Sequence, residues 1–320
     1  CGRRHGLRER LAVAYGRIVN VVVGKPGTQG RRIESRQANG APGMSIDFDI
    51  KLARKKQPST ATLQIHNPSD DTAAVFEDRT AYVRIELGYV DEGTFVAFTG
   101  NPTPGTAVFQ KTGANRTLTV QLQDGGLRYR VGRVEASFSE QVSAQEVFDE
   151  IIRQVGFPVG KTDLSTALPL VRGWTFSGMA RDALDDLAGH TGRGWFLRDG
   201  AIYMLDPRND TGETAVVFSS DNGNLIGSPS GVGVDVEYTN TSTSKAFLGI
   251  GEDKTVETVK TTQTRGVEIS GLPTAGVKTG RVFKVESRDY NGFYIAKEVS
   301  YKGSSYEGPF EVQIVGVPRR

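Results

Sequence analysis

Hydrophobic and polar residues alternate with a period of two along several short stretches of the chain. In the clearest stretch, the apolar positions are Met44, Ile46, Phe48, Ile50 and Leu52. Serine, aspartate and lysine occupy the positions between them, so one face of an extended strand is apolar and the other is polar and solvent-facing. The alternation returns at 61–65, 83–87 and 118–122, with turn-forming residues between the stretches. The pattern predicts short β-strands joined by turns, as in a sandwich or barrel.

Beyond residue 129 the hydrophobic period becomes that of a helix. Ser143 and Glu146 have the spacing of a capping box, in which each side chain accepts a hydrogen bond from the other residue's backbone N–H. Apolar residues then follow at helical spacing up to Val155, and Gly156 ends the helix. A second helix is predicted from about residue 178 to residue 190.

A hairpin is predicted directly after these helices. Residues 195–198 and 201–205 read as two strands, and Asp199-Gly200 between them tolerates the positive φ angles of a tight turn. Residues 131–207 are therefore predicted to form a compact α+β insert.

Strands resume after the insert, at 232–238, 282–285, 293–301 and 310–317. In the third of these, one phase holds the apolar residues Phe293, Ile295, Val299 and Tyr301. Residues 252–265 alternate as well but are mostly polar, and we interpret them as an exposed hairpin arm or a mobile loop. The chain is thus predicted to be mainly β with an α+β insert.

Composition narrows the class of protein. Hydrophobic residues make up 37% of the 320 positions and charged residues 24%, which is typical of a globular chain and not of a disordered one. Lysine and arginine number 39 against 37 acidic residues, so the net charge of +2 does not indicate a polyanion partner for the whole molecule. No apolar run approaches the length of a membrane-spanning helix.

Cysteine and histidine are too sparse for a metal site or a disulfide framework. Cys1 is the only cysteine, and His5, His66 and His190 lie far apart in the sequence. His66 ends a predicted strand in a turn-forming stretch, before a short helical turn around residues 72–76, and is interpreted as structural. A mature bacterial lipoprotein begins with a lipidated cysteine, so Cys1 leaves open the alternative that this chain is lipidated at its N-terminus. The five arginines of residues 1–17 suggest a basic arm or a solvated terminus.

Motifs for nucleotide binding are incomplete. Residues 156–162 end in Gly-Lys-Thr but have three residues between their glycines, where a phosphate-binding loop has four, and they follow a helix instead of a strand. Gly249-Ile250-Gly251 begins like a dinucleotide fingerprint, but Lys254 stands where the third glycine belongs. We therefore predict no cofactor and no cofactor-binding residue.

Motifs for hydrolysis are equally weak, and we predict no catalytic residue. The only near match to a nucleophile elbow, residues 227–231, has proline at its centre. The carboxylates of Asp182, Asp185 and Asp186 lie early in a helix, where they complement its dipole, and we interpret them as a solvated face. Trp174 and Trp195 lie beside apolar neighbours and are interpreted as core or domain-contact residues and not as sugar-stacking platforms.

Several stretches together resemble the baseplate and tail hub proteins of tailed bacteriophages, the late control D-like family. A Gly-Leu-Ile-Gly-Ser/Thr-Pro stretch opens the second β domain of that family, and 221–229 of this chain resembles it. Gly233-Val234-Asp235-Val236 matches the Gly-Val-x-Val strand that follows there. The helix over 179–188 leads into the hairpin at Trp195 as in these hubs. The helix that begins at residue 144 and the strands over 280–303 are also similar, although this chain lacks the histidine often found near residue 301.

The resemblance covers about residues 18–318 and implies a structural role in the virion. It implies a first tube-like β-barrel domain at 18–130, the α+β insert at 131–207 and a second tube-like β-barrel domain at 208–320, after an N-terminal arm at 1–17. Three such chains would form a ring of six barrel modules, which joins a sixfold tail tube to a threefold spike and lines the DNA channel. The implied partners are two further copies, the tail tube protein, and a spike or tape-measure component.

Two other readings stay open at this stage. One is a hub that also degrades the cell wall, which would need a hydrolase fold that no stretch of this chain supplies. The other is a carbohydrate-binding surface protein or lipoprotein, for which Cys1, Trp174 and Trp195 would matter. The sequence does not distinguish a contractile or flexible phage tail from a gene-transfer agent, and it names no ligand for the insert.

Overall fold

The computed structural model describes residues 16–25, 30–37, 40–78, 80–167, 169–170, 172–244 and 254–319. Side chains are described for these residues except 112, 127, 236–244 and 254–262. Almost all of the predicted basic arm, with Cys1 and His5, lies outside the described residues, as does the Gly249-Ile250-Gly251 stretch.

The first β segment forms the strands that the alternating pattern predicts. Its elements are β1 (Arg17–Gly24), β2 (Arg31–Glu34), β3 (Ile46–Ala53), β4 (Thr60–His66), α2 (Asp70–Ala74), β5 (Tyr82–Tyr89), β6 (Gly93–Pro102), β7 (Val108–Thr112) and β8 (Asn115–Gln123). In β3 every second residue is buried, from Ile46 to Leu52, and the residues between them are partly or fully exposed. The prediction for this strand is confirmed.

The described residues of the second β segment form six strands, two of which are unusually long. Its elements are β14 (Val216–Ser219), β15 (Leu225–Ser244), β16 (Lys254–Gly271), β17 (Val282–Glu286), β18 (Asn291–Ser304) and β19 (Phe310–Pro318). The single apolar phase predicted for β18 is wrong, because Ile295 packs in a small cluster with Val317 whereas Tyr301 packs in the main core. Phe293, at the start of the strand, is 48% exposed. A register shift between Ala296 and Glu298 changes the phase of β18, so its two halves do not share one buried face.

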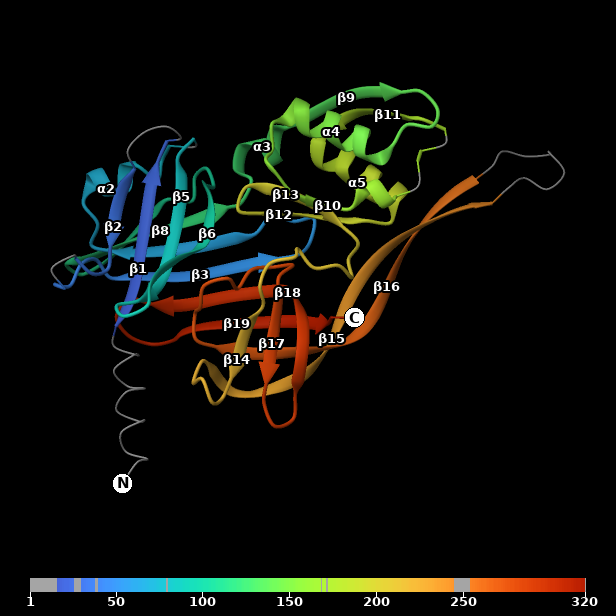
Figure 1. Cartoon of the computed structure of the whole chain (residues 1–320). Helices are drawn as coiled ribbons and strands as arrows, with labels where there is room; N and C mark the ends of the chain where they lie inside the picture. The colour runs from blue at the N-terminus through green and yellow to red at the C-terminus, as the bar shows by residue number, and fades with distance from the viewer. Residues whose placement is uncertain are drawn as a thin grey trace.

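The two β segments, far apart in the sequence, join into one sheet (Figure 1). The described strands run in the order β15-β16-β19-β18-β3-β4-β8-β6-β5-β1-β2. The join is antiparallel pairing of β18 with β3, in which Tyr301 lies opposite Ile50. This path has two ends and does not close into a barrel within the part of the chain that the structure describes.

The main hydrophobic core draws on both segments. Tyr301 is fully buried, and its hydroxyl donates to the carbonyl of Val277 at 2.6 Å. The ring of Phe48 meets that of Phe310 edge to face, with centroids 5.7 Å apart. Gly303 sits where these elements come closest, and a Cβ there would lie 2.9 Å from both the Phe48 ring and the Pro309 carbonyl oxygen. A side chain at position 303 is therefore excluded.

The insert has a hydrophobic core of its own, separate from that of the large sheet. Its elements are α3 (Gly126–Val131), β9 (Arg133–Phe138), α4 (Ala144–Val155), β10 (Val159–Thr162), the 3₁₀ turn η1 (Leu164–Thr166), β11 (Trp174–Met179), α5 (Ala180–Thr191), β12 (Gly194–Arg198) and β13 (Ala201–Leu205). The capping box is present, since Ser143 and Glu146 each bond the other's backbone. Asp199 and Gly200 have φ angles of 53° and 79°, which confirms the predicted tight turn.

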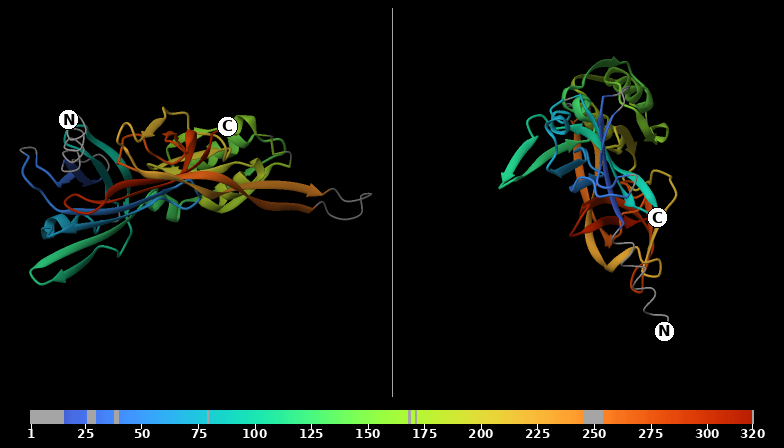
Figure 2. Two further views of the ribbon diagram at one scale, coloured as in Figure 1. Left: turned by 90° about the horizontal axis from the view of Figure 1, so that it is seen from below. Right: turned by 90° about the vertical axis from the view of Figure 1, so that its left-hand side faces the viewer.

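Two hairpins project from the sheet at opposite ends of the molecule (Figure 2). In one, β15 and β16 pair only with each other beyond Gly266, out to the pair of Ser244 with Lys254. This ribbon confirms the exposed-arm interpretation for the described residues of 252–265. The other hairpin consists of β7 and the start of β8, which pair from Val108↔Thr119 to Thr112↔Asn115. The fold is therefore mainly β with an α+β insert, as predicted.

Candidate interaction surfaces and the joint between insert and sheet

Buried charges anchor the β12–β13 hairpin tip to the large sheet. The ammonium of Lys278 lies 2.8 Å from an Asp199 carboxylate oxygen and also donates to the carbonyl of Ala97 at 2.9 Å. The carboxylate of Asp124 accepts the backbone N–H groups of Gly125 and Gly200 at 2.7 and 2.8 Å. Burial, and then the neighbouring Asp199 charge, raise the pKa of Asp124 to about 7.

A second anchor surrounds the guanidinium of Arg198, at the end of β12. Its Nη1 donates to the Thr279 carbonyl at 2.9 Å, and its Nη2 lies 2.6 Å from Glu213 Oε1. Burial works against ionisation of Glu213, but the hydrogen bond from Thr211 and the charge of Arg198 outweigh it and lower the pKa. Because Arg198 is buried and charged, removal of the Glu213 carboxylate would leave an uncompensated charge inside the protein.

Two basic side chains hold the segment that leaves the insert. Arg54, just after β3, donates to the carbonyl of Asp206 at 3.1 Å, and its guanidinium lies 5.2 Å from the centre of the Phe196 ring. Lys297 on β18 donates to the carbonyl of Pro207. Burial, and then the nearby Arg54 charge, lower the pKa of Lys297 to about 7. Both segments of the large sheet thus contact the outgoing chain.

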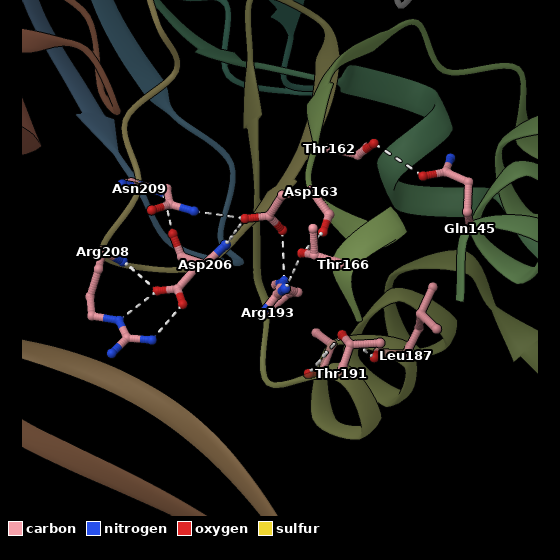
Figure 3. Close-up of polar contacts among 12 residues, drawn as sticks. Gln145, Thr162, Asp163, Thr166, Leu187, Thr191, Arg193, Asp206, Arg208 and Asn209 are labelled. Atoms are coloured by element: carbon pink, nitrogen blue, oxygen red, sulfur yellow. Dashed lines mark hydrogen bonds and ion pairs between the residues drawn. The ribbon is translucent and has the colours of Figure 1, made fainter. Parts of the chain in front are cut away.

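Within the insert, the carboxylate of Asp163 ties this outgoing segment to the end of α5 (Figure 3). One oxygen lies 2.7 Å from Arg193 Nε. The other accepts the backbone N–H of Asp206 and the side-chain amide of Asn209, each at 2.9 Å. Arg208 then pairs with the Asp206 carboxylate through two nitrogens, at 2.9 and 2.7 Å. Together these contacts hold the outgoing segment against the end of α5.

The predicted solvated face of α5 is wrong for two of its three carboxylates. The indole N–H of Trp174 donates to Asp186 at 2.6 Å, and that of Trp195 donates to Asp185 at 2.7 Å. Lys56 after β3 also pairs with Asp185, at 3.1 Å. A buried indole N–H needs an acceptor. Two tryptophans expected in the core close to an acidic stretch could therefore have indicated these hydrogen bonds from the sequence.

Both tryptophans are core residues, as predicted. Trp174 is 5% exposed and Trp195 is 3% exposed. The Trp174 ring stacks on Phe176, with planes 8° apart. Neither indole has a free face on which a sugar ring could stack, so the carbohydrate-binding alternative loses the two tryptophans that it required.

The histidines within the described residues are placed in strand and helix contacts. His66 Nε2 lies 2.8 Å from the Asp47 carboxylate, and its Nδ1 lies 3.2 Å from the Thr117 hydroxyl. The His66 interaction links β3, β4 and β8, which fits the structural interpretation. No group of three or more His, Cys, Asp or Glu side chains converges on one point in the described part of the chain. Residues 159–162, with the Gly-Lys-Thr sequence, form strand β10 and not a phosphate-binding loop.

Opposite the core, the large sheet presents a polar face over β8, β4, β3 and β18. Thr62 and Gln64 on β4 lie beside Asp47 and Asp49 on β3 and Lys302 on β18, and these residues line an open groove of about 400 Å³. The face over β8 continues it with further side chains, namely Thr117, Thr119, Gln121 and Gln123. Hydroxyl and amide groups therefore dominate the face over β4 and β8, whereas β3 and β18 contribute charged side chains of both signs.

Comparison with solved structures identifies the fold. The 43 kDa tail protein of prophage MuSo2 from Shewanella oneidensis matches with a TM-score of 0.57 and 10% identity, over 94% of this chain and 98% of that one. A tail protein from Neisseria meningitidis MC58 matches with a TM-score of 0.58 and 12% identity, over 95% and 97%. The chain has the fold of bacteriophage tail proteins.

A related secretion-system protein has the same fold. The E. coli c3393 protein, a type VI secretion component described as similar to the T4 tail proteins gp27 and gp5, matches with a TM-score of 0.53 and 11% identity, over 93% of this chain and 77% of that one. The sequence itself matches no family model and no curated protein. The resemblance to phage tail and baseplate proteins is confirmed through the fold. None of the helices in the described residues is long and apolar enough to cross a membrane.

Proposed function

We propose that this chain is a structural component of a phage tail or tail-like particle, namely the hub that joins the tail tube to the spike. The observation that carries the proposal is the match with two tail proteins along nearly the full length of both partners. The chain also matches structures of Francisella PdpA-VgrG complexes, with TM-scores of 0.55 and 0.54, so a similar fold occurs in another assembly. In this role the protein is part of the virion and has no catalytic residue.

We further propose a ring of three chains, each contributing two tube-like modules. The modules are residues 18–130 and 208–320, and the insert at 131–207 braces them through the anchors at Asp124, Arg198 and Lys297. Each module lacks a closed barrel within one chain, because the described sheet path ends at β2 and β15. Six such modules side by side would match a sixfold tube, while the three chains would match a threefold spike.

The polar face over β8, β4, β3 and β18 fits the wall of the channel through which DNA passes. Lysine or arginine side chains on such a wall would bind phosphates and slow the DNA. Strands β4 and β8 instead present hydroxyl and amide groups there, and the acidic side chains of the face (Asp47, Asp49, Glu298 and Glu307) outnumber its lysines, Lys51 and Lys302. This composition supports passage of DNA without sequence-specific binding.

Light scattering tests the proposal. The mass of the purified chain is measured over a range of concentrations, alone and with the tail tube protein added. A trimer of 34.6 kDa chains, formed alone or on the tube protein, is the expected result. A strict monomer that ignores the tube protein would contradict it.

A further inference from the structure

The arm formed by β15 and β16 has two unpaired backbone edges. From the pair Val232↔Gly266 to the pair Ser244↔Lys254, neither strand pairs with any other described strand, although helix α5 lies close to part of β15. A ribbon of two strands is only marginally stable in water by itself. Its residues include many β-branched ones, which favour extended backbone, and its unpaired N–H and C=O groups form a ready template for another strand.

The β7–β8 hairpin, at the other end of the molecule, has a second unpaired edge (Figure 2). Among the described strands, β7 pairs only with β8. Val108 and Phe109 are adjacent in β7 and therefore face opposite sides of the sheet, yet they are 50% and 39% exposed. Both sides of this hairpin thus present apolar surface that a neighbouring chain would cover.

The two edges are complementary in charge. Strand β15 contains two acidic residues, Asp235 and Glu237, and no lysine or arginine. Residues 105–118, which contain β7 and its turn, include Lys111 and Arg116 and no acidic residue. The guanidinium of Arg116 lies over the Phe109 ring at 4.8 Å and pairs with Asp70, whereas Lys111 is exposed beside the free edge.

We propose that β15 of one copy pairs with β7 of the next copy, so that each chain of the ring is joined to its neighbour by strand addition. Complementary edges at opposite ends of one chain make a head-to-tail contact, which closes into a ring when the rotation between copies permits. The inference rests on the ring of the proposed function and assigns the contact that builds it.

Charge-reversal variants test this pairing in the full chain. Lys111→Glu and Asp235→Lys are each expected to raise the concentration at which half of the chains are assembled by about fivefold, and the double variant is expected to restore assembly. The matched controls are Arg133→Glu and Glu140→Lys, which make the same charge changes at exposed positions of the insert. Both controls are expected to assemble like the wild type.

A backbone variant separates strand pairing from simple attraction between charges. The pair that closes a two-residue turn is hydrogen-bonded, so the alternation leaves the N–H groups of Phe109 and Lys111 directed to the free edge of β7. Lys111→Pro removes one of these donors without removing a bond to β8. It is expected to weaken assembly at least as much as Lys111→Glu, and the Asp235→Lys change is expected not to rescue it.

Cross-linking supplies a direct readout. With Cys1 replaced by serine, the variant that carries both Lys111→Cys and Asp235→Cys is expected to form disulfides between chains and to give a closed trimer on a non-reducing gel. Light scattering on the same samples distinguishes failure of the proposed strand pairing from failure of the proposed ring. A ring that assembles equally well in every variant would overturn the pairing and leave the hub in place, whereas a strict monomer, with and without tube protein, would overturn both.

Discussion

Asp124 makes the stability of this protein depend on pH in a direction opposite to that of most carboxylates. Its pKa is raised from 3.8 to about 7, mainly by burial beneath the β12–β13 hairpin. Between these values the folded chain binds a proton that the unfolded chain does not, so the free energy of unfolding falls as pH rises from about 4 to about 7. The whole effect is about 4 kcal/mol, and about 3 kcal/mol of it lies between pH 4.5 and 8.

Replacement of Asp124 with asparagine isolates this effect. The amide oxygen still accepts from Gly125 and Gly200, but the side chain no longer titrates. Urea unfolding of wild type and Asp124→Asn, followed by tryptophan fluorescence at pH 4.5 and pH 8, gives a difference in stability at each pH. We expect wild type to lose about 3 kcal/mol relative to the variant at the higher pH.

The control for this experiment is Asp221→Asn, at an exposed position of the loop before β15. Other titrating groups are the same in wild type and variant, so they cancel in the comparison. A difference that stays constant from pH 4.5 to pH 8 would show that Asp124 ionises normally in the folded chain, and the account of the hairpin anchor would then be wrong.

Three further changes probe other parts of the fold. Between about pH 7 and pH 10.5 the unfolded chain binds a proton that the buried Lys297 of the folded chain does not, so the free energy of unfolding of the wild type rises with pH. Lys297→Met should remove this rise in urea unfolding measured across that range. Ser143→Ala should lower the free energy of unfolding by about 1 kcal/mol through loss of the α4 capping box. In the same assay, Ser143→Thr should keep most of that stability. Asp163→Ala should lower the free energy of unfolding by about 3 kcal/mol, because the largely buried Arg193 loses its carboxylate partner. A decrease as small as that of the exposed control Asp221→Ala would refute the role of this network.

Local features of the fold were predictable from the sequence because their causes lie within a few residues. The alternation in β3 needs only a strand with one buried face, and the capping box at Ser143 needs only two residues three apart. The turn at Asp199-Gly200 depends on the φ angles that those two residues tolerate.

Long-range features were not predictable in the same way. The pairing of β3 with β18 joins residues about 250 positions apart, and no local pattern encodes it. The division of β18 between two hydrophobic clusters follows from a register shift within the strand, which alternation alone does not reveal. The anchors at Arg198 and Lys278 form only when the insert docks on the sheet, so their partners could not be named from the sequence.

The central claim is that three copies of this chain form a ring at the end of a tail tube. Electron microscopy of the chain mixed with assembled tube protein tests this most directly. The account predicts class averages in which a threefold ring with an open central channel caps one end of the sixfold tube. Single chains scattered along the tube wall, or a cap with six copies of the chain, would contradict it.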